Sequence, residues 1–212
     1  MAKTPKGSKI YSGFGYIVDV IYIGILWLIC CLPIFTIGPA STAMYYAMVK
    51  SVRHGRGHVT AEFFGAFRKN FIPSMKAWLL FMLLIGLWLV NSIVTSQTDP
   101  EGLKMMTRLS RFLIIPVCFP LPWLFAYISR FDNSFSDTMK YVVYLSVKNF
   151  VRSAVMLLSA AAFLFICCLS PALIPVLPGF CCLIMSYQTE PVFKALTSEF
   201  ESDENEDKWY NE

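Results

Sequence analysis

The sequence predicts an all-α protein with about six membrane segments. Of its 212 residues, 56% are hydrophobic and only 15% are charged, whereas about a quarter of the residues of a soluble domain are charged. Several long segments carry no charge at all, and lysine and arginine residues flank them. Because a soluble domain of this length needs a more highly charged surface, these observations favour a polytopic membrane protein.

Four segments contain no Asp, Glu, Lys or Arg. They are residues 20–49, 77–98, 112–129 and 153–189, which are 30, 22, 18 and 37 residues long. A charged side chain at the bilayer centre costs about 2.5–3.5 kcal/mol, and one helical crossing needs about 20 residues. The second and third segments are therefore predicted to cross once each. The first and last are long enough to fold back on themselves.

The two long segments each contain a turn signal. In the last segment, prolines 171, 175 and 178 precede Gly179. The first segment has a comparable signal between residues 32 and 40, and its motif residues are Leu32, Pro33, Thr36, Gly38, Pro39 and Ala40. We expect its two prolines to end helices, its glycine to permit a tight turn and its threonine to satisfy a freed carbonyl. The result would be a hairpin followed by a short second helix over residues 40–49.

The basic residues set the orientation of the helices. Lysines 3, 6 and 9 precede the first segment, six basic residues lie between residues 50 and 76, and four lie between residues 130 and 152. Since cytoplasmic loops are enriched in Lys and Arg, six crossings place all three groups, and both termini, in the cytoplasm. A five-crossing alternative, with residues 38–54 re-entrant or interfacial, would place the N-terminal lysines outside.

The chain divides into one helical domain and a tail. Residues 1–198 form the predicted membrane domain. Residues 199–212 hold half of the chain's 14 acidic residues and a single lysine. So high a density of negative charge predicts a disordered cytoplasmic tail.

A short motif occurs twice, 79 residues apart. Lys69, Asn70 and Phe71 are repeated as Lys148, Asn149 and Phe150, and a serine follows three residues after each phenylalanine. Each copy lies where a predicted crossing leaves the cytoplasm. An offset that covers two crossings preserves orientation, so the motif predicts a parallel internal repeat.

Both cytoplasmic connections are predicted to contain a surface helix. In residues 60–71 the phenylalanines at positions 63, 64, 67 and 71 fall on one helical face, which is typical of an amphipathic interfacial helix. In the second connection, Ser134 and Asp137 have the spacing of a capping box, and the helix is expected to run towards Lys148.

The sequence contains no recognisable catalytic or cofactor-binding constellation. His54 and His58 have helical metal-ligand spacing, but Gly55 and Gly57 oppose a helix there, so a solvated basic loop is expected. Asp19 and the carboxylate at position 190 lie near the ends of their predicted crossings. The seven cysteines lie in apolar segments without a C-x-x-C pattern, which favours packing roles. We therefore predict no enzymatic activity, cofactor, metal or nucleic-acid partner, and the lipid bilayer as the principal partner.

Residues 32–46 carry the pattern L-P-x-x-T-x-G-P-A-x-x-A, which a basic loop and F-x-x-F-R-K-N-F follow. This combination resembles the YesL-like family of uncharacterised bacterial integral membrane proteins. The resemblance implies a multi-pass protein of the bacterial cytoplasmic membrane that is encoded near genes for carbohydrate uptake or use. It also implies subunits of a sugar-transport system as possible partners.

Two functions are compatible with these observations. The first is a non-enzymatic accessory or scaffold protein associated with carbohydrate uptake. The second is a small permease that moves a sugar or similar solute by itself, with the proline-interrupted helices shaping its pathway.

Overall fold

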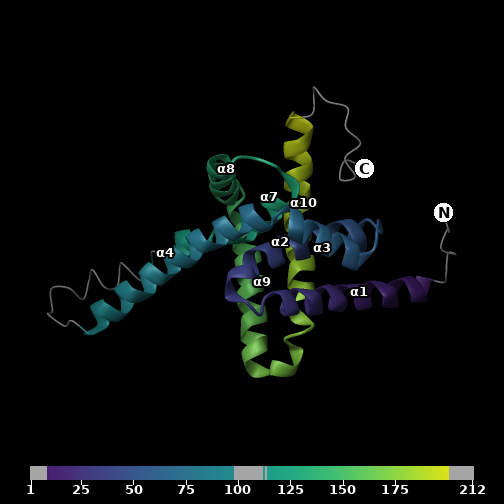
Figure 1. The fold of residues 1–212 in the computed structure, drawn as a ribbon, viewed down its shortest axis with the longest axis horizontal. Helices are drawn as coiled ribbons and strands as arrows, with labels where there is room; N and C mark the ends of the chain where they lie inside the picture. The colour runs from purple at the N-terminus through teal and green to yellow at the C-terminus, as the bar shows by residue number, and fades with distance from the viewer. Residues whose placement is uncertain (1–8, 98–111, 113, 201–212) are drawn as a thin grey trace.

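A computed structural model describes residues 9–97, 112 and 114–200, and this part of the chain is all α-helical, without a strand. The connection 98–111 and the tail from residue 201 lie outside the described residues. The helices, shown in Figure 1, are α1 (Lys9–Cys30), α2 (Ile37–Ala47), α3 (Val59–Lys69), α4 (Phe71–Gln97), α6 (Ile114–Cys118), α7 (Leu121–Arg130), α8 (Phe135–Lys148), α9 (Phe150–Leu169) and α10 (Leu177–Phe200).

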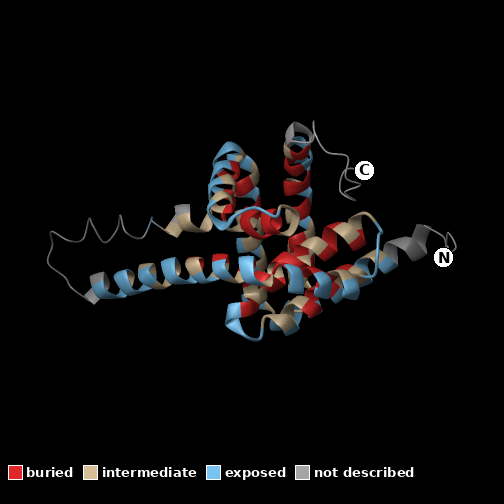
Figure 2. Cartoon of the chain, turned by 45° about the horizontal axis from the view of Figure 1, so that its top comes forward, coloured by how far each residue is buried: buried red, intermediate tan, exposed pale blue. Residues whose placement is uncertain are grey.

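Helix α2 forms the centre of the molecule. It packs against α1, α3, α4 and α7, and its small residues Ala40, Ala43 and Ala47 are fully buried. The buried residues gather around this helix, whereas the distant part of α4 is exposed (Figure 2). Small side chains allow neighbouring helices to approach α2 closely, which explains how so short a helix contacts these four and also α10.

The predicted hairpin in the last apolar segment is confirmed. Helix α9 ends at Leu169, a 3₁₀ turn covers Pro171–Leu173, and α10 returns alongside α9. Helix α1 crosses α10 where Gly24 and Gly179 meet. A Cβ atom on Gly179 would collide with the backbone of Val20, so this crossing requires glycine.

Within residues 9–97 and 114–200, two helical segments are long and apolar enough to cross a membrane. They are Phe71–Val94 in α4 and Phe150–Leu169 in α9. Their apolar side chains face outwards: Leu87 is 59% exposed and Leu158 is 73% exposed. Figure 1 shows α4 leaving the body in a different direction from the α9 and α10 pair. The exposed apolar faces of these two helices give weak support for membrane association.

The structure corrects two predicted element boundaries. The first turn is shorter than expected, because a 3₁₀ turn at Ile34–Thr36 leads directly into α2. Pro39 therefore lies in the first turn of a helix and does not end one, a position that tolerates proline since the N–H groups there have no intrahelical acceptor. In the third segment, α6 and α7 replace one 18-residue helix among the described residues.

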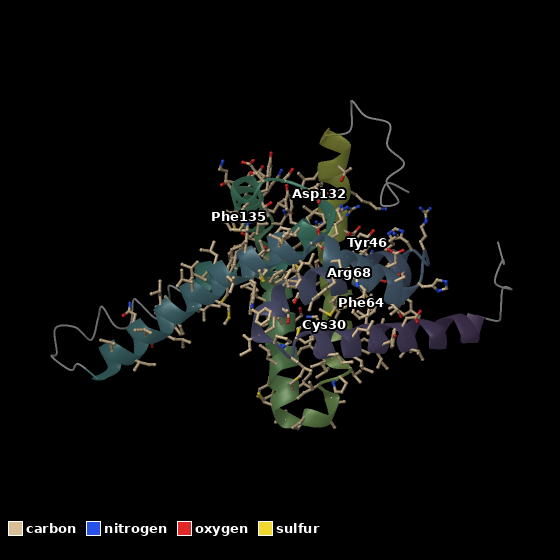
Figure 3. All side chains as sticks on the ribbon, in the orientation of Figure 1. Cys30, Tyr46, Phe64, Arg68, Asp132 and Phe135 are labelled. Carbon is tan, nitrogen blue, oxygen red and sulfur yellow. The ribbon has the colours of Figure 1, made fainter. Side chains whose placement is uncertain are left out.

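The two predicted cytoplasmic helices are present. Ser134 caps α8 and accepts a hydrogen bond from the Asp137 backbone N–H, which confirms the capping prediction. The first helix, α3, ends at Lys69, so the expectation that Phe71 continues it is wrong. Phe63 is fully buried, so the apolar face of α3 is partly covered by the protein itself. Figure 3 labels Phe64 and Arg68 on the same helix, and both are exposed.

Candidate functional site

The turn motif positions the start of α2. The Thr36 hydroxyl lies 2.5 Å from the Cys30 carbonyl oxygen and 2.6 Å from that of Pro33, and it can donate to either. The Cys30 carbonyl belongs to the last turn of α1, where carbonyls lack intrahelical donors, and the Pro33 carbonyl also accepts the Thr36 backbone N–H at 3.0 Å. Leu32 and Pro33 are exposed, with Leu32 at 81%. Thr36 thus stabilises the turn between α1 and α2.

The other motif residues bring α2 close to α4. Gly38, Pro39 and Ala40 are buried in the first turn of α2. A Cβ atom on Gly38 would lie 2.6 Å from the Cβ of Trp78 and 2.7 Å from the carbonyl oxygen of Ser74, both on α4. The motif is therefore explained by a tight turn and a close helix crossing.

The two copies of the repeated motif form equivalent joints between helices. Asn70 separates α3 from α4, and Asn149 separates α8 from α9. The Asn70 N–H donates to the Ala66 carbonyl at 2.9 Å, and the Asn149 N–H donates to the Leu145 carbonyl at 3.0 Å. In both joints the asparagine carbonyl then accepts from the serine four residues later. Lys69 and Lys148 precede the joints and are exposed, whereas Phe71 is half-buried and Phe150 is exposed.

The serine that follows each joint is hydrogen-bonded to an earlier helix, α2 in the first case and α7 in the second. Ser74 shares a 2.8 Å hydrogen bond with Thr42 of α2. Ser153 accepts a 2.8 Å hydrogen bond from the indole N–H of Trp123 in α7. All four residues are buried. Among the described residues, each serine thus makes a buried hydrogen bond to an earlier helix, Ser74 to α2 and Ser153 to α7.

A buried ion pair joins three helices. The guanidinium of Arg130, at the end of α7, lies 2.9 Å from Glu190 Oε2 in α10, and each side chain is only 4% exposed. The Tyr45 hydroxyl of α2 donates to Glu190 Oε1 at 2.9 Å and lies 2.6 Å from the Thr189 hydroxyl. The Phe193 ring centroid is 5.7 Å from the Arg130 guanidinium carbon. We call Tyr45, Arg130, Thr189 and Glu190 the buried polar cluster.

A second set of contacts ties the π-helix Met48–Arg53, which follows α2, to α10. Arg53 donates to the Ser186 carbonyl at 2.8 Å, and its guanidinium carbon lies 4.3 Å from the Tyr187 ring centroid. Such cation–π contacts add to the hydrogen bonds when they are partly shielded from water. Arg53 and the buried polar cluster thus hold the same stretch of α10 from two neighbouring positions.

Lys50 connects the π-helix to α3. Its ammonium donates to Glu62 at 2.7 Å and to the Tyr46 hydroxyl at 3.2 Å. Burial opposes the charged form of Lys50, but the hydrogen bonds to Glu62 and Tyr46 outweigh burial and raise the pKa of Lys50. Figure 3 labels Tyr46, which lies in the last turn of α2, directly before the π-helix. Lys50 is therefore part of the protein's internal structure and is not directed at a ligand.

The two histidines lie in a loop, as predicted. Gly55 and Gly57 have φ values of 63° and 80°, which place them in the left-handed region and interrupt the helix. His54 is half-buried and His58 is exposed. Burial, which disfavours the charged imidazole, lowers the pKa of His54. In the described part of the chain no three His, Cys, Asp or Glu side chains gather as metal ligands would.

The sequence alone did not indicate the buried polar cluster. Arg130 and Glu190 each end a charge-free segment, so each was interpreted as a charge at the membrane surface. Nothing in their spacing shows that α7 and α10 place them face to face. In the cluster the Arg130 guanidinium and the Tyr45 phenol both donate to the Glu190 carboxylate. Such a buried network fixes the positions of the helices that carry it.

Comparison with known proteins adds one finding. Residues 20–92 match the sequence model of a family described as "Protein of unknown function, DUF624". The matched segment contains the turn motif, α2, α3 and the Asn70 joint. Arg130, Glu190 and the second joint lie outside it. No curated protein and no solved structure matches the chain.

Proposed function

We propose that the protein is a multi-pass, non-enzymatic accessory or scaffold protein of the bacterial cytoplasmic membrane, associated with carbohydrate uptake or use. The observation that carries this proposal is the difference in polarity between the interior of the body and the exposed faces of its helices. The acid, cation and phenol of the buried polar cluster are held together by hydrogen bonds inside the body, while the apolar faces of α4 and α9 are exposed. Exposed faces of this kind require lipid or an apolar partner.

The proposed topology has about six membrane segments, with both termini in the cytoplasm. The lengths of α4 and α9, the α9–α10 hairpin and the distribution of basic residues support it. Helix α2, continued to Val49 in the π-helix that follows it, is the short second segment, and neighbouring helices cover it. We further propose that α2–α3–α4 and α7–α8–α9 are copies of one ancestral unit, on the strength of their matching asparagine joints and serine contacts.

The association with carbohydrate uptake comes from the resemblance to the YesL-like family. The match of residues 20–92 to a family of unknown function is compatible with that resemblance. The partners in this proposal are integral subunits of a sugar-transport system.

Site-specific photo-crosslinking in the native host, followed by purification in mild detergent, tests the proposal. A crosslinker replaces Leu87 of α4 or Leu158 of α9, which are 59% and 73% exposed. The matched control is Met156 of α9, which is fully buried. We expect transport subunits to be captured from an exposed position and not from Met156. Capture of lipid alone from both exposed positions would contradict a scaffold role.

The alternative function is a permease. The interruption between α6 and α7 and the turn between α1 and α2 favour it, since broken helices line the pathways of many transporters. This alternative predicts sugar flux into liposomes that contain only the purified protein. An absence of flux for every sugar on which the host grows would exclude it.

A further inference from the structure

A pocket of about 240 Å³ lies where α4 begins, α7 ends and α8 begins. Its lining includes Ile72 and Lys76 of α4, Ile128 of α7, and Phe135 and Thr138 of α8. Figure 3 labels Phe135, at the start of α8, and Asp132 on the loop before it. Helix α4 and the consecutive helices α7 and α8 therefore build one concave surface. None of the contacts in the buried polar cluster involves this pocket.

Most of the pocket wall is apolar, and its one charged group is a cation. Lys76 makes no hydrogen bond or ion pair with the described residues. Thr138 is 5% exposed, and its hydroxyl likewise has no described hydrogen-bond partner. The lining contains no acidic side chain. A ligand that fits this surface combines an apolar portion with an anionic group.

Neighbouring acidic residues do not neutralise Lys76. Asp132 lies 2.7 Å from Lys69, and Asp137 lies 3.2 Å from Lys140. Asp137 is also bonded to the hydroxyl of Ser134 at 2.7 Å. Both carboxylates near the pocket are thus engaged with other groups. The positive charge of Lys76 is available to a ligand, which gives the pocket electrostatic complementarity to an anion.

The position of the pocket relative to the apolar segments identifies the source of the anion. Lys76 immediately precedes the charge-free segment 77–98, and Ile128 lies next to the end of the charge-free segment 112–129. Two predicted membrane boundaries therefore meet at this pocket. In the proposed topology both are on the cytoplasmic side, at the level where lipid phosphates lie.

We propose that this pocket binds one anionic phospholipid, with Lys76 contacting the phosphate and Ile72, Ile128 and Phe135 contacting the start of an acyl chain. The volume accommodates a headgroup or the first carbons of a chain, so the remainder of the lipid lies outside against the exposed side of α4. Thr138 supplies a second donor to the headgroup. This inference rests on the membrane location proposed above.

Native mass spectrometry of the full-length protein in detergent tests the assignment. The probes are phosphatidylglycerol and phosphatidylcholine with identical chains, and inorganic phosphate. We expect one phosphatidylglycerol to bind more tightly than phosphatidylcholine, and Lys76→Gln to weaken that binding about tenfold, as the loss of one charge-assisted contact does. Lys148→Gln is the matched control, because it removes a cation that is also exposed at a predicted membrane boundary but lies outside the pocket.

A second variant separates the pocket from general surface charge. Thr138→Leu keeps Lys76 but fills part of the volume, and we expect it to weaken binding of phosphatidylglycerol without changing the thermal midpoint by more than the control does. Equal losses in Lys76→Gln and Lys148→Gln would overturn the assignment. If millimolar inorganic phosphate displaced phosphatidylglycerol, the pocket would be a site for free phosphate and the lipid assignment would be wrong.

Alkaline carbonate extraction of host membranes distinguishes this inference from the proposed function. Release of the protein from membranes would overturn both. Retention in the membrane fraction together with no preference for phosphatidylglycerol would overturn the lipid pocket alone.

Discussion

Glu190 is the acidic residue whose replacement the structure predicts to be most damaging. It is 3% exposed and is bonded to both Arg130 and Tyr45. Removing one partner of a buried pair leaves the other charge uncompensated, so we expect Glu190→Gln to lower the free energy of unfolding by about 3–5 kcal/mol. A thermal melt of the detergent-solubilised protein measures the change.

The exposed pair between Lys69 and Asp132 provides the control. Its side chains are 67% and 73% exposed. Asp132→Asn is therefore expected to change stability by less than about 1 kcal/mol. Similar shifts for Glu190→Gln and Asp132→Asn would show that the buried polar cluster does not hold the helices together.

Thr36 tests the turn motif at a single hydroxyl group. Thr36→Val keeps the shape of the side chain but removes the donor to the Cys30 and Pro33 carbonyls. We expect a loss of about 1 kcal/mol in stability, since the partly buried Cys30 carbonyl loses its donor while the Pro33 carbonyl keeps the backbone N–H of Thr36. Thr36→Ser retains the hydroxyl and should lose less. Equal losses in the two variants would assign the effect to packing of the methyl group.

His54 provides a test of pH dependence. Burial lowers its folded-state pKa below the ordinary value of 6.5. Its neutral form therefore contributes stability that is fully present above pH 6.5 and is lost as the pH falls through the lowered pKa. An NMR titration of histidine-labelled protein, with His54→Gln to assign the signal, measures that pKa. A value at or above 6.5 would contradict the burial of this imidazole.

At the scale of elements, the serine contacts test how the two units are tied. Ser153→Ala leaves the indole N–H of the fully buried Trp123 without its acceptor. We expect a loss of about 1–3 kcal/mol. Ser159→Ala, on the same helix, removes only a local bond to the Met156 carbonyl and is the matched control. Equivalent thermal midpoints for the two variants would refute a tertiary role for Ser153.

Sequence patterns predicted the elements whose signals are local. The capping residue Ser134, the glycines of the 54–58 loop and the prolines after α9 act through their own backbone, so their effects could be read from neighbouring residues. The boundary near Pro39 was missed, whereas an interruption of the third segment by its prolines was expected. Proline is tolerated in the first turn of a helix, and the sequence does not distinguish a helix that begins at proline from one that ends there.

Contacts between distant segments could not be predicted in the same way. The pairing of Arg130 with Glu190 and of Thr42 with Ser74 depends on which helix faces meet. Charge-free segments reveal where helices lie but carry little information about their rotation. The repeated K-N-F motif did not reveal the helix breaks at Asn70 and Asn149, since the first surface helix was expected to continue to Phe71.

At the scale of the whole molecule, exposed apolar helices and an internally bonded polar core divide the protein into two regions. The apolar faces of α4 and α9 are turned away from the body, and the ion pair lies within it. Such a division suits a protein whose surroundings are apolar and whose helices are positioned by buried polar contacts. The account therefore depends most on a membrane location with a defined orientation.

Topology mapping with paired reporters tests this central claim most directly. Fusions of a cytoplasm-active fluorescent protein and a periplasm-active phosphatase are placed after residues 56, 100, 133 and 172 and at both termini. Six crossings predict fluorescence at both termini and after residues 56 and 133, with phosphatase activity after 100 and 172. Phosphatase activity at the N-terminus, with the results at every other position unchanged, would select five crossings. Fluorescence at every position would contradict a membrane-spanning protein.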